Sequence, residues 1–369
     1  MRLLFDARYI RTDFHDGISR YSAELAAAVA ALAPERDVEI AYLIHDEAQR
    51  AFLPDGARAL RIHAPTAVRE PLTALVLNGY RPDAVFSPMQ TIGTLGRRFG
   101  LILTLHDTIY YRHRTPPRNL PWYVRVGWRL FHLSYVPQRL TLNAADIVAT
   151  VSETSAAEFA RVRLTTRPVV VIPNAPQRLA ELLPDGVGVE PGAENLVYMG
   201  SFMGYKNVET LIRAMAELPG RTLHLLSRIS DERRAELERL ADGRGGTVHF
   251  HNGVTDAEYA ALLADRAVLV SASLDEGYGL PVAEALALGV PAVVTDMPIF
   301  REVAGDGALY APGTDAAAFA AAVRELDDPV RRDAVIAAGT DHIARFSWER
   351  SANVLLDAVT RVAGVARGR

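Results

Sequence analysis

The sequence predicts an α/β protein made of two doubly wound, Rossmann-like domains in tandem. Short apolar runs alternate with amphipathic stretches along the first half of the chain, and the alternation starts again near residue 195. A segment rich in proline and glycine separates the two sets. Strands that alternate with helices favour a parallel sheet covered on both faces, and ligands bind beyond the carboxyl ends of such strands. We therefore expect a ligand site in a cleft between the two domains.

The first domain is predicted to span residues 1–175. Its candidate strands are short apolar runs, and amphipathic stretches such as 20–33 lie between several of them. In chain order these strands are RLLFD (2–6), EIAYLI (39–44), AVFS (84–87), LILTLH (101–106), DIVATVS (146–152) and PVVVIPN (168–174).

The second domain is predicted to span residues 194–346, after a linker at 176–193 that is rich in proline and glycine. Its candidate strands have the same character as those of the first domain and are again separated by helical patterns. They are NLVYMG (195–200), TLHLLS (222–227), TVHFHN (247–252), AVLVSAS (267–273), PAVVTD (291–296) and GALYAP (307–312).

Composition narrows the class of function. The net charge of −4 argues against a nucleic-acid binder, which usually carries an excess of basic residues. The absence of cysteine excludes disulfides, zinc–thiolate sites and a thiol nucleophile, and it fits a cytoplasmic protein. The start of the chain lacks the apolar region of a signal peptide, and no uncharged apolar run is long enough to span a membrane. Any contact with a membrane is therefore expected to be peripheral.

Lys206 is the single lysine among the 40 lysine and arginine residues of the chain. It lies in the loop SFMGYK, between a predicted strand that ends at Gly200 and a predicted helix that follows Asn207. Asn207 is a favourable N-cap, and the free N–H groups and the dipole of a helix N-terminus attract anions. The lysine at this point predicts a phosphate site.

A second glycine turn, Gly277-Tyr278-Gly279, follows the predicted strand 267–273. Pro281 suits the first position of the next helix, and Gly289 suits its C-terminal end. A single turn of this kind is more often scaffold than ligand site. Two such turns in one domain favour a diphosphate bound at the edge of the sheet.

Glu276 and Glu284 lie on either side of the second turn. Glu284 also suits the dipole of the helix N-terminus, so its simplest role is to stabilise the helix. Carboxylates accept charge-assisted hydrogen bonds from sugar hydroxyls as well. We therefore expect the two glutamates to bracket a nucleotide sugar.

The segment DEGYGLPVAEALALGVPAVVTD (275–296) resembles the Glu-x7-Glu signature of the retaining family 4 glycosyltransferases, which have the GT-B fold. Glu276 and Glu284 stand at the required spacing. The resemblance implies that the last helix, 347–369, packs back on the N-terminal domain. Supporting similarity covers most of the chain, in GISRYSAEL (17–25), LTLHDTIYY (103–111), VATVSETSAAEF (148–159), VVVIPNAP (169–176), YMGSFMGYKNVETLI (198–212) and FSWERSA (346–352).

The resemblance also implies roles for the matching residues of the second domain. Glu276 would contact hydroxyls of the donor sugar, and Glu284 would contact the ribose of the nucleotide. Lys206 would bind the diphosphate and neutralise charge on the leaving group. The backbone N–H groups of Gly279 and Leu280 would face the same diphosphate.

In the N-terminal domain, the resemblance places Gly17 in the loop that meets the donor phosphates and the acceptor, and His106 near the transferred sugar. A histidine at a strand end is more often structural than catalytic, but the carboxyl end of a strand beside the expected cleft favours a sugar contact. Asp107 is predicted either to fix the tautomer of His106 or to cap the next segment, and it is a candidate for acceptor binding.

Two positions depart from the family pattern. Family members commonly have arginine after the glycine that corresponds to Gly200, whereas this chain has Ser201, whose hydroxyl donates one hydrogen bond but carries no charge. Arg228 is predicted to supply the missing cation at the donor site. Asp16 stands where paired glycines are common, and beside a diphosphate it would be unfavourable unless its side chain points away. We therefore expect Asp16 to contact the acceptor.

The implied reaction moves a sugar, mannose or another hexose, from a UDP- or GDP-sugar to a hydroxyl of a glycan or lipid-linked acceptor, with retention. Electrostatic stabilisation of the departing diphosphate would accelerate the reaction. A donor phosphate oxygen would take the proton of the acceptor hydroxyl. No cofactor or metal is expected. The alternatives are a catalytically weak nucleotide-sugar-binding subunit of a glycan-assembly complex and another GT-B enzyme, such as a phosphorylase or an epimerase. A pyridoxal-dependent phosphorylase is disfavoured, since one lysine would have to serve two sites.

The stretch from Thr108 to Ala145 contains no acidic residue. It holds six arginines, among them Arg125 and Arg129, interleaved with aromatic residues. One interpretation is a surface that meets anionic lipid or a lipid-linked acceptor at the inner face of the membrane. The other is a packed helix whose arginines extend their charged ends into solvent.

Overall fold

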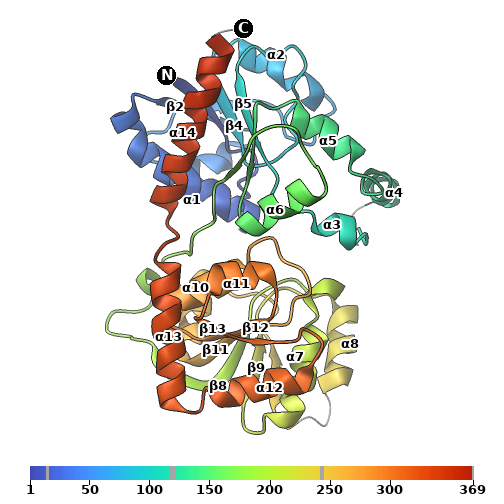
Figure 1. Ribbon diagram of the computed structural model, residues 1–369, viewed down its shortest axis with the longest axis vertical. Helices are drawn as coiled ribbons and strands as arrows, with labels where there is room; N and C mark the ends of the chain where they lie inside the picture. The colour runs from blue at the N-terminus through green and yellow to red at the C-terminus, as the bar shows by residue number, and fades with distance from the viewer. Residues whose placement is uncertain (14–15, 117–120, 242–244, 368–369) are drawn as a thin grey trace. The chain divides into compact units, whose positions relative to one another are not determined.

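The computed structural model describes residues 1–13, 16–116, 121–241 and 245–367, and the chain divides into two compact units (Figure 1). The first unit comprises Met1–Asn174 and Ser347–Arg369, and the second comprises Ala175–Phe346. Each unit contains one parallel β-sheet with helices packed on it. The predicted α/β fold with two doubly wound domains is confirmed.

The sheet of the first unit has seven parallel strands in the order β3-β2-β1-β4-β5-β6-β7. Six of them match predicted strands, and the sequence missed only β3, a three-residue strand at the edge of the sheet. The order reverses between β1 and β4. The strands are β1 (Arg2–Asp6), β2 (Glu39–Ile44), β3 (Ala59–Arg61), β4 (Ala84–Ser87), β5 (Gly100–Thr104), β6 (Ile147–Thr150) and β7 (Val169–Val171).

The helices of the first unit include the last helix of the chain, α14, which contacts α1, β4 and β5 as predicted. They are α1 (Gly17–Leu32), α2 (Thr73–Asn78), α3 (Ile109–Arg112), α4 (Trp122–Phe131), α5 (Val136–Asn143), α6 (Glu153–Arg161) and α14 (Trp348–Arg367). Three 3-10 helices accompany them, η1 (Ala33–Arg36), η2 (Glu47–Phe52) and η3 (Glu70–Leu72).

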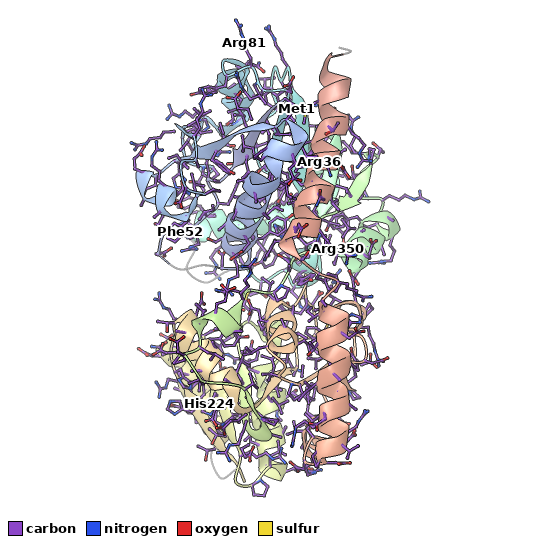
Figure 2. The ribbon with its side chains drawn as sticks, turned by 90° about the vertical axis from the view of Figure 1, so that its left-hand side faces the viewer. Met1, Arg36, Phe52, Arg81, His224 and Arg350 are labelled. Carbon is purple, nitrogen blue, oxygen red and sulfur yellow. The ribbon has the colours of Figure 1, made fainter. Side chains whose placement is uncertain are left out.

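Polar contacts and close backbone packing hold α14 on the first unit. Arg36 donates hydrogen bonds of 2.8 Å to Asp357 and to Asn353, and it lies beside α14 in Figure 2. A Cβ atom at Gly100 would lie 2.6 Å from the backbone oxygen of Val362, so only glycine lets helix and strand approach so closely. The C-terminal segment is therefore an integral part of the first unit.

The sheet of the second unit has six parallel strands in the order β10-β9-β8-β11-β12-β13, and all six match predicted strands. The order reverses between β8 and β11. The strands are β8 (Glu190–Tyr198), β9 (Thr222–Leu225), β10 (Thr247–Phe250), β11 (Asp265–Ser271), β12 (Ala292–Thr295) and β13 (Ala308–Ala311). Residues 176–193, for which a linker was predicted, lie in this unit and contain the 3-10 helix η4 (Leu179–Leu182) and the first residues of β8.

The core of the second unit joins helices to the central strands. Buried residues of α7 and α12 pack with alternate residues of β8, β9 and β11 in one apolar cluster. The helices are α7 (Val208–Ala214), α8 (Asp231–Ala241), α9 (Asp256–Ala264), α10 (Leu280–Ala287), α11 (Pro298–Ala304), α12 (Ala316–Glu325) and α13 (Pro329–Ile343), with the 3-10 helices η5 (Gly204–Lys206) and η6 (Met215–Glu217). This packing fixes the loops that leave the carboxyl ends of β8 and β11.

Candidate active site

Lys206 and Glu276 meet at the point where the strand order of the second sheet reverses. Lys206 follows β8 and Glu276 follows β11, the two strands that flank the reversal. Nζ of Lys206 donates a hydrogen bond of 2.5 Å to Oε1 of Glu276, and their side chains are only 16% and 14% exposed. Doubly wound sheets bind ligands at this reversal point, beyond the carboxyl ends of the strands. The structure thus brings the two principal predicted site residues together.

Asn207 ties the lysine-bearing loop to the rest of the sheet edge. Its backbone is left-handed, with φ 50° and ψ 42°, and its side chain makes no capping hydrogen bond, so the predicted N-cap interaction is wrong. Instead, Nδ2 donates to the backbone oxygens of Ala272 and Gly313, at 3.1 and 2.6 Å. Asparagine tolerates the left-handed region better than most residues, which explains its use here. The consequence is a fixed place for Lys206 beside the loop after β11.

The glycine turn before α10 also has a strict geometry. Gly279 has φ +93°, and a Cβ atom there would lie 2.8 Å from the ring of Phe300. Helix α10 starts at Leu280, so Pro281 is its second residue, not the first as expected. Within the described residues, the N–H groups of Gly279 and Leu280 donate no hydrogen bond. They can therefore donate to an anion, and their contact with a diphosphate stays a prediction.

A small cavity lies under these groups. Its volume is about 20 Å³, and Lys206, Glu276, Gly279 and Phe300 are among the residues that line it. A cavity of this size holds about one water molecule. Glu284, within α10, is only 1% exposed. A diphosphate would have to bind outside this cavity, and the role of Glu284 toward a ribose stays a prediction.

Ser201 and Arg228 lie at the carboxyl ends of neighbouring strands, β8 and β9. The hydroxyl of Tyr198 donates to the backbone oxygen of Ser201 at 2.7 Å, while the Ser201 hydroxyl makes no hydrogen bond with the described residues. Arg228 is exposed and lies against Gly253. Both residues share the sheet edge with Lys206, and their roles in donor binding stay predictions.

The sequence analysis missed Ser273, which contacts Glu276 directly. Its Oγ atom donates a hydrogen bond of 2.9 Å to Oε1 of Glu276. The signal that could have found it is a serine three residues before the glutamate, at the end of a strand whose carboxyl edge was already a predicted ligand site.

In the first unit, His106 is held as a neutral ring. Its Nε2 atom lies 2.9 Å from the backbone oxygen of Pro88, and because a carbonyl only accepts, Nε2 carries the proton. Burial lowers the pKa of His106, an effect that the Pro88 hydrogen bond and the charge of Asp16 partly oppose. Its Nδ1 atom makes no hydrogen bond with the described residues and can accept one from a hydroxyl.

The two aspartates proposed for acceptor binding both have capping contacts. Oδ1 of Asp107 accepts a hydrogen bond of 2.9 Å from the N–H of Ile109, which favours the capping alternative over a contact with His106. Asp16 is the N-cap of α1 and accepts from the N–H of Ser19 at 2.9 Å, directly before Gly17 opens the helix. These contacts give each aspartate a local structural role, and their contact with an acceptor stays a prediction.

Helix α4 carries Arg125 and Arg129, and none of its residues is buried. Trp122 is 76% exposed and Leu130 is 62% exposed. The side chain of neither arginine forms an ion pair or a hydrogen bond with the described residues. Trp128 nevertheless packs against the rings of Tyr110 and His132, so the helix has both a packed side and an exposed one. The choice between the two interpretations stays a prediction.

The chain is similar in sequence to known glycosyltransferases. Residues 184–341 match the family model of the glycosyl transferases group 1. The chain is 28% identical over 233 residues to the O-antigen chain mannosyltransferase B of Escherichia coli. That alignment covers 59% of this chain and 61% of the relative, so the chain spans less than two thirds of the relative's length.

Solved structures show the same fold. The sucrose-phosphate synthase from Thermosynechococcus elongatus matches with a TM-score of 0.71 at 19% identity, over 99% of both chains. An Anabaena protein solved in complex with UDP and glucose matches with a TM-score of 0.67 at 16% identity, over 97% of this chain and 99% of that one. Residues 184–341 are therefore similar to the glycosyl transferases group 1, and the chain has the GT-B fold.

Proposed function

We propose that this protein transfers a hexose from a nucleotide-diphosphate sugar to a hydroxyl of a glycan or lipid-linked acceptor, with retention of the anomeric configuration. The observation that carries the proposal is the meeting of Lys206 and Glu276 at the reversal point of the second sheet. The match of residues 184–341 to the glycosyl transferases group 1 supports it.

Lys206 stabilises the leaving group in this proposal. The bond between the anomeric carbon and the donor phosphate oxygen breaks, and negative charge builds up on the departing diphosphate. The ammonium of Lys206 and the amides of Gly279 and Leu280 stabilise that charge in a partly buried site. A bond forms between the anomeric carbon and the acceptor oxygen, whose proton passes to a phosphate oxygen of the leaving group.

Glu276 and His106 contact the transferred sugar. Within the described residues, Oε2 of Glu276 makes no hydrogen bond, so it can accept one from a sugar hydroxyl. Nδ1 of the neutral His106 can accept another. Glu284 binds the ribose, and Arg228 compensates for the uncharged Ser201. Since Lys206 supplies the positive charge, we propose that the reaction needs no metal, and that a chelator leaves turnover unchanged.

The donor is a UDP- or a GDP-sugar. The Escherichia coli relative is a mannosyltransferase, which favours mannose as the transferred hexose. The Anabaena structure contains UDP and glucose, which supports a uridine diphosphate sugar as the alternative donor. The two donors differ in base and in sugar, so both are needed in the first test.

We also propose peripheral contact with an anionic membrane through α4. No helix of the described chain could cross a membrane. The unpaired Arg125 and Arg129 suit lipid phosphates, and the exposed Trp122 and Leu130 suit the apolar interface. Such contact would bring the enzyme to a lipid-linked acceptor at the inner face of the membrane.

Release of nucleoside diphosphate from UDP-glucose and GDP-mannose, with and without acceptor lipid extract, tests the activity. We expect one donor to be hydrolysed slowly without acceptor. Lys206→Ala should lower turnover by about 10²- to 10³-fold, as loss of a preorganised charge does, and Lys206→Arg serves as the control that keeps the charge. A binding subunit, the alternative that Ser201 favours, would bind a donor and release nothing. Equal turnover by the parent protein and Lys206→Ala would contradict the proposed mechanism.

A further inference from the structure

Ser273 holds the carboxylate of Glu276 from the buried side. The Ser273 side chain is fully buried and Ser271 is 9% exposed, and both lie at the carboxyl end of β11. Oγ of Ser271 donates to Oγ of Ser273 at 3.2 Å, and Oγ of Ser273 donates to Oε1 of Glu276 at 2.9 Å. The direction of this chain is fixed, because an ionised carboxylate only accepts.

The two oxygens of Glu276 have different surroundings. Oε1 accepts from Ser273 and from Lys206, whereas Oε2 has no partner among the described residues. The carboxylate is therefore held through one oxygen and presents the other. Of the two donors, Ser273 is fixed in the core, while Lys206 lies at the end of a long, flexible side chain.

We propose that Ser273 is a positioning residue that keeps Glu276 oriented toward the donor sugar once a diphosphate draws Lys206 away. This inference rests on the proposed function. A diphosphate competes with Glu276 for the ammonium, and the buried hydroxyl then becomes the remaining donor on Oε1. Without the Ser273 hydroxyl, the carboxylate of Glu276 is free to rotate. Binding of the sugar must then also offset the conformational entropy that is lost when the carboxylate becomes ordered. Ser273 thus makes the sugar contact independent of the phosphate contact.

This role makes a prediction that a merely structural role does not. Loss of the Ser273 hydroxyl should weaken binding of a nucleotide sugar but not binding of the nucleoside diphosphate alone, because only the sugar contacts Glu276. Because this hydrogen bond is made to a charged group, we expect its removal to lower the affinity for the nucleotide sugar by about 10-fold. Ser273→Thr, which keeps the hydroxyl, should restore most of it.

Calorimetric titration of the whole protein with UDP, UDP-glucose, GDP and GDP-mannose tests the proposal. The proteins compared are the parent, Ser273→Ala, Ser273→Thr, Glu276→Gln and the Ser273→Ala/Glu276→Gln double variant. We expect Ser273→Ala to lose affinity only for the sugar nucleotide, and to cause no further loss when Glu276 is already changed. Ser271→Ala leaves the Ser273–Glu276 contact in place and should have a smaller effect, which guards against a folding defect in the other variants.

Two outcomes separate failure of this role from failure of the proposed function. The positioning role alone would be overturned if Ser273→Ala weakened binding of the nucleoside diphosphate and of the nucleotide sugar equally. It would also be overturned if Ser273→Ala lowered the affinity for the nucleotide sugar just as much in the Glu276→Gln background. A parent protein that binds none of the four nucleotides would overturn the proposed function and this role together.

Discussion

The ammonium of Lys206 is bound to the carboxylate of Glu276, although 70 residues separate them in the sequence. Both side chains are largely buried, so the contact is screened less by salt than a surface ion pair. In the proposed function, a donor diphosphate exchanges places with Glu276 on the lysine. Once Lys206 turns to the diphosphate, Ser273 remains as the hydrogen-bond donor to Oε1 of Glu276.

Glu284 is the residue whose change should weaken nucleotide binding most selectively. We expect Glu284→Gln, which keeps the size of this buried side chain, to lower affinity for the nucleoside diphosphate by about 10-fold, since a hydrogen bond from the ribose to a charged group is replaced by a weaker one. Calorimetry measures this directly. UDP and GDP both contain the ribose, so either nucleotide tests the contact. Unchanged affinity for both nucleotides would refute the ribose contact.

Gly279 and Gly289 form a matched pair for a stability measurement. Both have positive φ, +93° and +81°, so alanine is strained at either position. A Cβ atom at Gly279 would also collide with the ring of Phe300, whereas one at Gly289 would meet nothing within 4 Å. We expect Gly289→Ala to lower the free energy of unfolding by about 1–2 kcal/mol and Gly279→Ala to lower it further. Chemical denaturation that gives equal losses would contradict the steric part of the argument.

A group of histidines on β9 and β10 should make the second unit sensitive to acid. Nε2 of His224 donates to Oδ1 of Asn195, so its Nδ1 must accept from Nε2 of His251, 3.0 Å away. Burial, with the neighbouring His251 and His249, lowers the pKa of His224 to about 4, while Asp265 opposes the shift. His224 is labelled in Figure 2.

The sign of the effect follows from that pKa. Between the ordinary pKa of histidine, about 6.5, and the folded value of about 4, the unfolded chain binds a proton that the folded chain does not. Stability contributed by neutral His224 is therefore present above pH 6.5 and lost as the pH falls toward 4. We expect the Tm to drop between pH 7.5 and pH 5, and to drop less in His224→Gln. An identical drop in that variant would show that other groups cause it.

The surface of α4 predicts binding to anionic vesicles. We expect the parent protein to co-sediment with vesicles that contain phosphatidylglycerol, and Arg125→Gln/Arg129→Gln to bind several-fold more weakly, since each basic residue near such a surface contributes about 1 kcal/mol. Arg81→Gln/Arg98→Gln is the matched control, because it removes the same charge from exposed positions elsewhere on the same unit. Binding that is insensitive to salt and equal in both double variants would refute the lipid contact.

The sequence predicted the fold well where apolar runs are continuous. Strands such as β4 and β12 are four buried residues in a row, which is typical of a parallel strand covered on both faces. Strand β3 escaped notice because it has three residues and only partly buried side chains. Its place depends on pairing with β2, which no local pattern reveals.

The site was predictable in its parts but not in its contacts. The single lysine and the glycine turn after β11 marked two loops that meet in the structure. The Lys206–Glu276 pair depends on the neighbouring places of β8 and β11, which only the folded sheet sets. Asn207 was misjudged because an N-cap normally has an extended backbone, whereas tertiary hydrogen bonds to Ala272 and Gly313 hold it left-handed.

Helix α4 shows a different limit of prediction from sequence. An amphipathic helix with arginines and aromatics fits both a packed helix and an exposed interface, since either buries one apolar face. The structure shows features of both, since Trp122 and Leu130 are exposed while Trp128 packs on Tyr110. That exposure depends on which elements of the first unit lie beside the helix, and the helical pattern itself carries no such information.

The central claim, that Lys206 binds the diphosphate of a nucleotide, has a direct test because the chain has no other lysine. An amine-reactive reagent can modify only Lys206 and the N-terminal amine, and peptide mass spectrometry separates the two. We expect saturating UDP or GDP to slow modification of Lys206 at least 10-fold, with no change at the N-terminus. If neither nucleotide changes the rate at Lys206 while calorimetry shows that nucleotide is bound, the diphosphate is held elsewhere and the account is wrong.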